Sequence, residues 1–375
     1  MGTIQRTHAG WMLGALGACV LVASASYAQP QIATERPGSL LMFPKVVRDG
    51  TRDTVLQITN TGNMPNHVRC FYLDGAPGFG GVPVWTVRDF ELDLTRQQPT
   101  HWRASQGRKV DQKSDFGSEE AGLDPGLVPS LPVGFTGALV CAEIGTDGFP
   151  VALNALKGEA TIEGPGVNES KYNALALQGG TTISDDNVLD LNGTEYAACP
   201  AASHLNFIPD GANDPVIEEL GFDGICTGGP TPGLPCFTSG QCGLGGSCTT
   251  GETNVTTALT VLPCNLDFQN GIPSRITLQF EVHDEFEVMF SGSTQVDCWR
   301  SFNIGILSSL RSNLQPFGAI TTQYATARIT SSSGGPFVAV AESFHTDSAG
   351  NTGSAAVNLH MEGTSNARVI LSDTF

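Results

Sequence analysis

The sequence predicts an all-β protein made of two antiparallel β-sandwich domains with a small disulfide-rich insert. Three observations support this. Apolar and polar residues alternate in many short segments. Turn dipeptides such as Asp74-Gly75 and Asn270-Gly271 separate these segments. No long segment after residue 28 has the 3.6-residue apolar period of a helix. One-sided alternation is typical of strands that bury one face, as in antiparallel sandwiches.

The alternating segments occur along the whole chain. In residues 275–283, every second residue from Ile276 to Val282 is apolar and the intervening ones are polar. Residues 90–96 and 356–362 repeat this pattern. We predict further strands at residues 53–60, 67–75, 137–145, 157–164, 171–178, 257–264, 324–330 and 337–344.

The length indicates more than one domain. The chain has 375 residues, and single domains mostly hold about 100–200. We predict an N-terminal β-sandwich at residues 29–165 and a C-terminal β-sandwich at residues 166–375. A Cys-rich insert at residues 209–255 interrupts the second domain.

The N-terminus reads as a secretory signal peptide, residues 1–28. Arg6 precedes an apolar run from Trp11 to Ala23, and Ser26 and Ala28 occupy the −3 and −1 positions of a cleavage site. The apolar run is shorter than the roughly 20 residues that span a bilayer. We expect a secreted or cell-surface protein without a membrane span after cleavage. A retained membrane anchor and lipidation at Cys19 are the alternatives.

The charge balance limits the partners. The chain holds 19 basic and 37 acidic residues, a formal net charge of −18. Such a chain repels nucleic acid and anionic membrane surfaces. The expected partner is a protein or glycan at the cell surface, and self-association is a further expectation.

Four cysteines concentrate in the insert. Nine, five and five residues separate Cys226, Cys236, Cys242 and Cys248. Structural zinc sites usually have Cys-x(2–4)-Cys pairs and thioredoxin-type sites have Cys-x-x-Cys, and neither pattern occurs. Exported chains use cysteines mainly in disulfides. We therefore predict a small loop that is cross-linked by two internal disulfides.

The sequences that flank the insert suggest a hairpin. Strand-like residues 202–208 precede the insert and residues 257–264 follow it. Cys199 and Cys264 then lie on opposite arms at comparable distances from the tip, which makes them a candidate pair. Cys298 is the predicted odd thiol.

Two stretches carry a family resemblance. "DTVLQITNTGN" (53–63) followed by "HVRCFYLDG" (67–75) resembles the opening strands of immunoglobulin-like modules of bacterial surface and secreted proteins. "PVGFTGALVCAEIG" (132–145) is similar to a late strand of exported bacterial β-sandwich proteins. The resemblance covers about a third of the chain. It implies immunoglobulin-like sandwiches, an extracellular role and no catalytic residues to transfer. It also implies a disulfide between Cys70 and Cys141 across the two sheets.

No catalytic motif is found. The chain has no His-Glu-x-x-His, no Gly-x-Ser-x-Gly and no phosphate-binding loop. We expect a protein that is not an enzyme and has no cofactor.

Calcium is the one candidate ion, because it binds carboxylate, amide and carbonyl oxygens. Two acidic loops offer these groups, although neither has EF-hand spacing. Their residues are Asp185, Asp186, Asn187 and Asp190 in the first loop and Asp210, Asn213, Asp214, Glu218 and Glu219 in the second.

Two functions follow. The first is an exported, non-enzymatic β-sandwich protein of the surface or extracellular matrix with a structural or adhesive role. The second is an extracellular carbohydrate-binding or carbohydrate-active protein, with calcium as a candidate cofactor. The second function needs an exposed aromatic face for sugar stacking, and the candidates are Trp85, Trp102, Trp299, Phe71, Tyr72 and Phe79.

Overall fold

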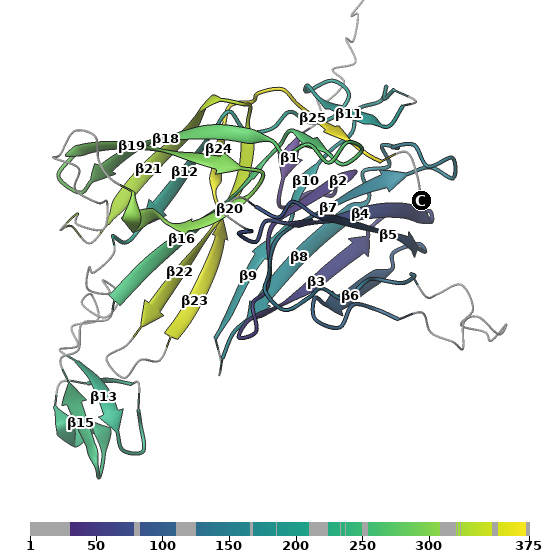
Figure 1. The fold of residues 1–375 in the computed structure, drawn as a ribbon. Helices are drawn as coiled ribbons and strands as arrows, with labels where there is room; N and C mark the ends of the chain where they lie inside the picture. The colour runs from purple at the N-terminus through teal and green to yellow at the C-terminus, as the bar shows by residue number, and fades with distance from the viewer. Residues whose placement is uncertain are drawn as a thin grey trace, which may run out of the picture.

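The computed structural model describes residues 31–78, 83–109, 125–165, 168–184, 186–209, 224–232, 234–236, 238–249, 254–307, 320, 322, 324–346 and 352–372. These residues form an all-β protein with several antiparallel sheets (Figure 1). The described helices are two short 3-10 turns, η2 (Ser239–Cys242) and η3 (Ile304–Ile306). Within the described residues, no helix has the length and apolar character needed to cross a membrane. The predicted signal peptide, residues 1–28, lies outside them.

Ten strands form the first sheet, in the order β5-β4-β7-β2-β3-β8-β9. Outside this order, β10 pairs with β2, β1 pairs with β10, and β6 pairs with β3. Their bounds are β1 Ile32–Ala33, β2 Leu40–Arg48, β3 Asp53–Asn60, β4 Asn66–Asp74, β5 Val87–Leu94, β6 Pro99–Arg103, β7 Phe135–Ile144, β8 Leu156–Glu163, β9 Glu169–Asn173 and β10 Leu175–Leu177.

A corner between β2 and β3 divides this sheet into two layers. The two strands pair only at Arg48 and Asp53, whereas each pairs extensively with its other neighbours. One layer holds β5, β4, β7 and β2, and the other holds β6, β3, β8 and β9. The first core lies between them, and its large members include Phe43, Leu56, Tyr72, Trp102 and Ile162.

The second unit also has two facing sheets. A five-stranded sheet has the order β19-β18-β21-β12-β24, and a four-stranded sheet has the order β20-β16-β22-β23. A core that includes Phe207, Phe280, Phe302 and Phe337 fills the space between them. The bounds are β12 Ala202–Phe207, β16 Asn254–Pro263, β18 Arg275–Asp284, β19 Met289–Asp297, β20 Arg300–Asn303, β21 Ala325–Ser333, β22 Phe337–Thr346, β23 Thr352–Asn358 and β24 His360–Glu362.

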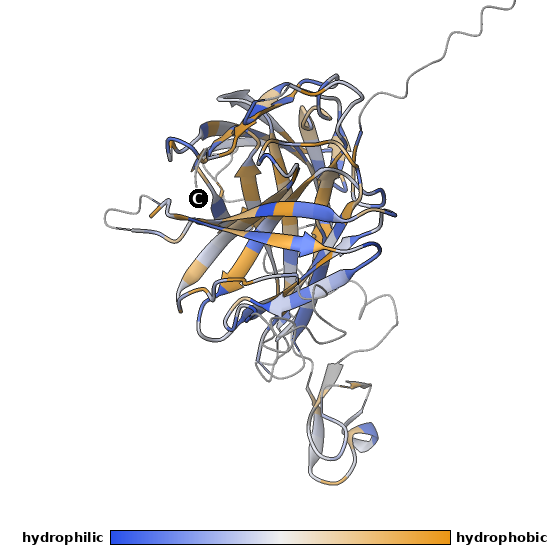
Figure 2. Ribbon diagram, turned by 90° about the vertical axis from the view of Figure 1, so that its right-hand side faces the viewer, coloured by the Kyte–Doolittle hydropathy of each residue, from blue (hydrophilic) through white to orange (hydrophobic). Residues whose placement is uncertain are grey.

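The two units share a further core. A small sheet of β11 (Val188–Leu191), β25 (Ala367–Ile370) and β17 (Leu266–Asp267) covers the outer face of β4, β7 and β2. Strands β17 and β25 are parallel, unlike the other pairs. In this core, Phe71 of β4 stacks on Phe268 with ring centroids 4.2 Å apart. Figure 2 shows the hydrophobic residues gathered in the central strands.

Strands β2, β7 and β22 are buried on both faces over most of their length, whereas β3, β18 and β21 bury one face as expected. In β22, Phe337, Ala339 and Ala341 enter the core of the second unit, whereas Val338 and Val340 contact the first. This double burial explains the continuous apolar run "FVAVA". The predicted boundary at residue 165 falls between β8 and β9, which pair with each other, so the first sheet continues to Leu177.

The disulfide between Cys70 and Cys141 forms, but it is not an inter-sheet bridge. The two residues lie directly opposite each other on the neighbouring strands β4 and β7, with Cα atoms 4.0 Å apart. The implied bridge across the two sheets was wrong, because β4 and β7 belong to the same layer. Cys298 is free and buried.

Cys199 and Cys264 also form a disulfide, but the predicted hairpin does not form. Strand β12 lies in the five-stranded sheet and β16 lies in the four-stranded sheet. The insert therefore connects two facing sheets. The two segments flank the insert in sequence, which suggested that they pair with each other. In the structure they instead lie in the two facing sheets of the second unit.

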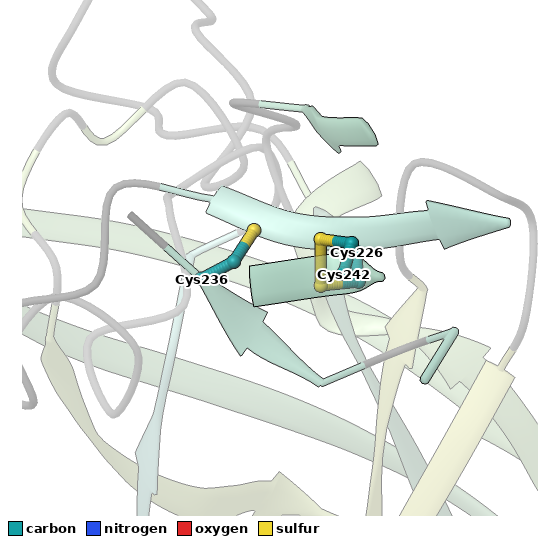
Figure 3. A group of neighbouring side chains, drawn as sticks. All are labelled: Cys226, Cys236 and Cys242. Carbon is teal, nitrogen blue, oxygen red and sulfur yellow. A yellow bond between two sulfur atoms is a disulfide. The ribbon is translucent and has the colours of Figure 1, made fainter. Parts of the chain in front are cut away.

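The insert forms a separate disulfide knob, which we define as residues 224–249. It has three short strands, β13 (Gly224–Gly228), β14 (Pro235–Cys236) and β15 (Gly246–Thr249), in the order β14-β13-β15. A disulfide joins Cys226 to Cys242 (Figure 3), and a second joins Cys236 to Cys248. The knob stands apart from the sheets (Figure 1), and its apolar cluster contains only its own cysteines.

Candidate binding site between the two units

A cavity of about 640 Å³ lies where the two units meet. The first unit contributes residues of β2, of the turn before β3, of β7 and of the segment after β4. The second unit contributes residues from the end of β19 to β20. The volume is within the range of small-ligand sites. The lining residues are Lys45, Val47, Arg52, Gly75, Pro77, Pro83, Thr136, Gln295, Asp297, Trp299, Arg300 and Ser301.

A bulge in β2 positions Lys45 at this site. Pro44 has no backbone N–H, so it interrupts the ladder, and the register of β2 with β7 shifts between Phe43 and Val46. The hydroxyl of Tyr172 fills the gap. It accepts a hydrogen bond from the Lys45 N–H at 3.1 Å and donates one to the Lys45 carbonyl oxygen at 2.5 Å. The bulge therefore directs a lysine from a central strand toward the second unit.

Lys45 pairs with Glu342 of β22 in the interior. The Lys45 Nζ lies 2.5 Å from Glu342 Oε2, and the two side chains are 3% and 1% exposed. Ser170 of β9 donates its hydroxyl to Glu342 Oε1 at 2.6 Å. Burial lowers the pKa of Lys45, and the Glu342 carboxylate acts against that shift. A buried pair of this kind is costly to break, because the remaining charge loses its partner.

Arg52 is held over the same carboxylate by the turn before β3. Its NH1 lies 3.4 Å from Glu342 Oε2, and its Nε donates to Asp49 Oδ2 at 2.9 Å. Asp49 Oδ1 also accepts the backbone N–H groups of Thr51 and Arg52. The turn thus fixes the position of a half-buried guanidinium at the cavity.

The second unit supplies an aromatic wall and a further cation. Trp299 donates its indole N–H to the Pro44 carbonyl oxygen at 2.6 Å. It packs on Gly75, where an added Cβ would lie 2.3 Å from the Trp299 ring. The Arg300 guanidinium donates to Thr294 Oγ1 and to the Gln295 carbonyl oxygen. Both acceptors are uncharged, so these contacts do not neutralise Arg300.

Arg300 is the unneutralised cation of the cavity. Three basic residues and one acidic residue, Asp297, belong to the described lining, but Lys45 pairs with Glu342 and Arg52 with Asp49. The described hydrogen bonds of Arg300 go to uncharged acceptors instead. Asp297 itself pairs with Arg275 at 2.5 Å. A cation at a cavity whose neighbouring groups are uncharged attracts an anion.

The calcium candidates do not converge in the described residues. Asp186 Oδ1 accepts hydrogen bonds from the Ser184 hydroxyl and the Val188 N–H, and Asp190 pairs with Arg368 at 2.8 Å. The other candidates, Asp185, Asp210, Asn213, Asp214, Glu218 and Glu219, lie outside the described residues. Calcium binding stays a prediction.

The knob cysteines are close enough together to suggest a metal. Ligand atoms of Cys226, Cys236 and Cys242 lie within 4.8 Å of one another. Metals bind the thiolate, however, and all of these sulfurs are in disulfides. The group therefore cross-links the knob (Figure 3).

The described aromatic candidates belong mainly to the cores. Trp102, Trp299, Phe71 and Tyr72 are buried, and Trp85 is half-buried. Phe79 lies outside the described residues. Buried rings are not available for sugar stacking, so these residues form no exposed aromatic face.

The sequence reasoning missed Lys45, Arg52, Arg300 and Glu342. A signal was present for the buried pair. Lys45 interrupts "LLMFPKVVR" and Glu342 interrupts "FVAVAESF", and both strands are otherwise mainly apolar. Charged residues are almost never fully buried unless they are paired. Each charge thus indicated a partner, although not which one.

Comparisons with known proteins give no family. No family model matches the chain, and no curated protein matches it. A red sea bream transglutaminase is 8% identical with a TM-score of 0.13, over 92% of this chain and 31% of its own. A viral chemokine binding protein, R17, encoded by a rodent gammaherpesvirus is 9% identical with a TM-score of 0.18, over 89% of this chain and 88% of its own. A Pleurotus ostreatus lectin is 11% identical with a TM-score of 0.14, over 88% of this chain and 77% of its own. At these scores none supports an argument about fold or function.

The Asp49 turn predicts a specific acid sensitivity. Partial burial alone would raise the pKa of Asp49, but the backbone N–H groups of Arg52 and Thr51 outweigh it and hold the pKa at about 2. Because the pKa is lowered on folding, this stabilisation is present above about pH 4 and is lost as the pH falls toward 2. We expect Asp49→Asn to be less stable than wild type at pH 6, with the difference vanishing near pH 2. Urea unfolding across this range measures it, and a difference independent of pH would contradict the assignment.

Proposed function

We propose that the chain is an exported, non-enzymatic protein of the cell surface or extracellular matrix that binds an acidic glycan in the cavity between its two units. Each unit is proposed to be an immunoglobulin-like β-sandwich. In support, each unit encloses its own core between two layers, and the four disulfides suit an oxidising compartment.

Arg300 carries the proposal, because it lines the cavity of a strongly acidic protein and its described hydrogen bonds go to uncharged groups. Arg300 is half-buried and is held by uncharged acceptors, so its guanidinium can pair with an incoming carboxylate. Gln295, Ser301 and Thr136 offer polar groups to sugar hydroxyls. Asp297 is the one acidic residue of the described lining, which supports binding rather than the two-carboxylate chemistry of a glycosidase.

Calorimetry with the chain that lacks residues 1–28, the proposed signal peptide, tests the proposal. We expect an oligogalacturonate to bind, a neutral cello-oligosaccharide of equal length to bind more weakly, and added salt to weaken the acidic ligand. Arg300→Gln should reduce the affinity about tenfold or more, since a hydrogen bond to a charged group contributes about 1.5–3 kcal/mol.

Arg368→Gln is the matched control, because Arg368 is exposed on β25 and pairs with Asp190 outside the cavity lining. It should leave the affinity unchanged. Equal binding of the acidic and neutral sugars, or no effect of Arg300→Gln, would refute the proposal.

A further inference from the structure

A row of charged and imidazole side chains crosses the exposed face of the five-stranded sheet. The ladder places His360 of β24 opposite His204 of β12, and His204 opposite Arg328 of β21. Directly opposed residues point to the same face of a sheet. Glu362 lies two residues after His360 on β24, so it shares that face.

The contacts in this row bring two imidazoles and one carboxylate together. His204 Nε2 lies 2.6 Å from Glu362 Oε2. The rings of His204 and His360 have centroids 6.3 Å apart. Arg328 donates to both carboxylate oxygens of Glu362, at 2.8 and 3.1 Å, and so fixes its orientation.

We propose that His204, His360 and Glu362 form a zinc-binding site on this face. Two imidazole nitrogens and one carboxylate oxygen are a common zinc ligand set, with water in the fourth position. Two nitrogens that bind one zinc ion at about 2.0–2.1 Å are about 3.3 Å apart. Binding therefore requires the exposed His360 ring to rotate toward His204, since the two ring centroids are 6.3 Å apart.

The ion would take the place of the contact between His204 Nε2 and Glu362 Oε2. An imidazole binds a metal through the lone pair of its nitrogen, so zinc competes with a proton for that atom. Arg328 and His204 contact the Glu362 carboxylate from two neighbouring strands and hold it in place. Glu281 of β18 faces Arg328 and adds a second negative charge to this face.

This site is separate from the glycan cavity. It lies on β12, β21 and β24, whereas the cavity is lined by residues of the first unit and of the β19–β20 region. The two proposals can therefore fail independently.

Titration of the untagged, chelator-treated mature chain with zinc chloride tests the proposal. We expect one zinc per chain and a higher melting temperature. His204→Gln and His360→Gln should each weaken binding about tenfold or more. Because both side chains are on the surface, the metal-free variants should melt as wild type does.

His283→Gln is the matched control, since His283 is an imidazole on β18 of the same sheet and should not contribute. If His204→Gln disturbs folding, His360→Gln decides alone. The proposal is overturned by an absence of binding, by binding that survives both variants, or by loss of binding in His283→Gln. Zinc-dependent dimerisation in sedimentation, with half a zinc per chain, would also overturn it.

Discussion

Glu342→Gln is expected to destabilise the protein by about 3–5 kcal/mol, because Lys45 would stay buried without its counter-charge. Both side chains are almost fully buried, and they join β2 of the first unit to β22 of the second. Equilibrium unfolding in urea measures the loss. We expect wild type and variant to unfold in one main transition of the body, since the units share a core.

A double variant shows whether the loss of stability comes from the unpaired buried charge or from altered packing. Lys45→Met with Glu342→Leu removes both charges and should recover most of the stability, because apolar residues often replace a buried ion pair at little cost. The control is Asp190→Asn, which breaks an exposed pair with Arg368 and should cost at most about 1 kcal/mol. If Glu342→Gln is as mild as Asp190→Asn, the buried pair does not hold the units together.

Removing the Cys199–Cys264 disulfide by a double serine substitution should cost about 4 kcal/mol. The cysteines are 65 residues apart, and a cross-link over a loop of that length restricts the unfolded chain strongly. Thermal unfolding of the double variant is the measurement.

The knob offers the matched comparison. Serine substitution of Cys226 and Cys242 removes a disulfide between residues 16 positions apart within the knob. The apolar cluster of the knob contains only its own cysteines. It should leave the main transition unchanged, apart from a local loss in the knob. A similar fall in both variants would mean that the knob and the sheets unfold together.

The all-β class could be predicted because period-two alternation is local. Strands such as β18 and β3 follow it closely. The register is not local, since it depends on which faces meet in space. This is why residues 202–208 and 257–264 suggested a hairpin, although β12 and β16 belong to facing sheets.

The candidate site was harder to predict for the same reason. Lys45 and Glu342 are 297 residues apart, and only the packing of the two units brings them together. Trp299 stood out as an aromatic residue, yet its role depends on Gly75 and on the Pro44 carbonyl oxygen. The cysteines were more tractable, because exported chains mostly pair them and the insert isolates four of them.

The most direct test of the proposed binding function is a crystal structure of the mature chain in complex with an oligogalacturonate. We predict density in the cavity between the β2 bulge and β20, with a sugar carboxylate within hydrogen-bonding distance of Arg300. A ligand bound elsewhere while this cavity holds only water would contradict it.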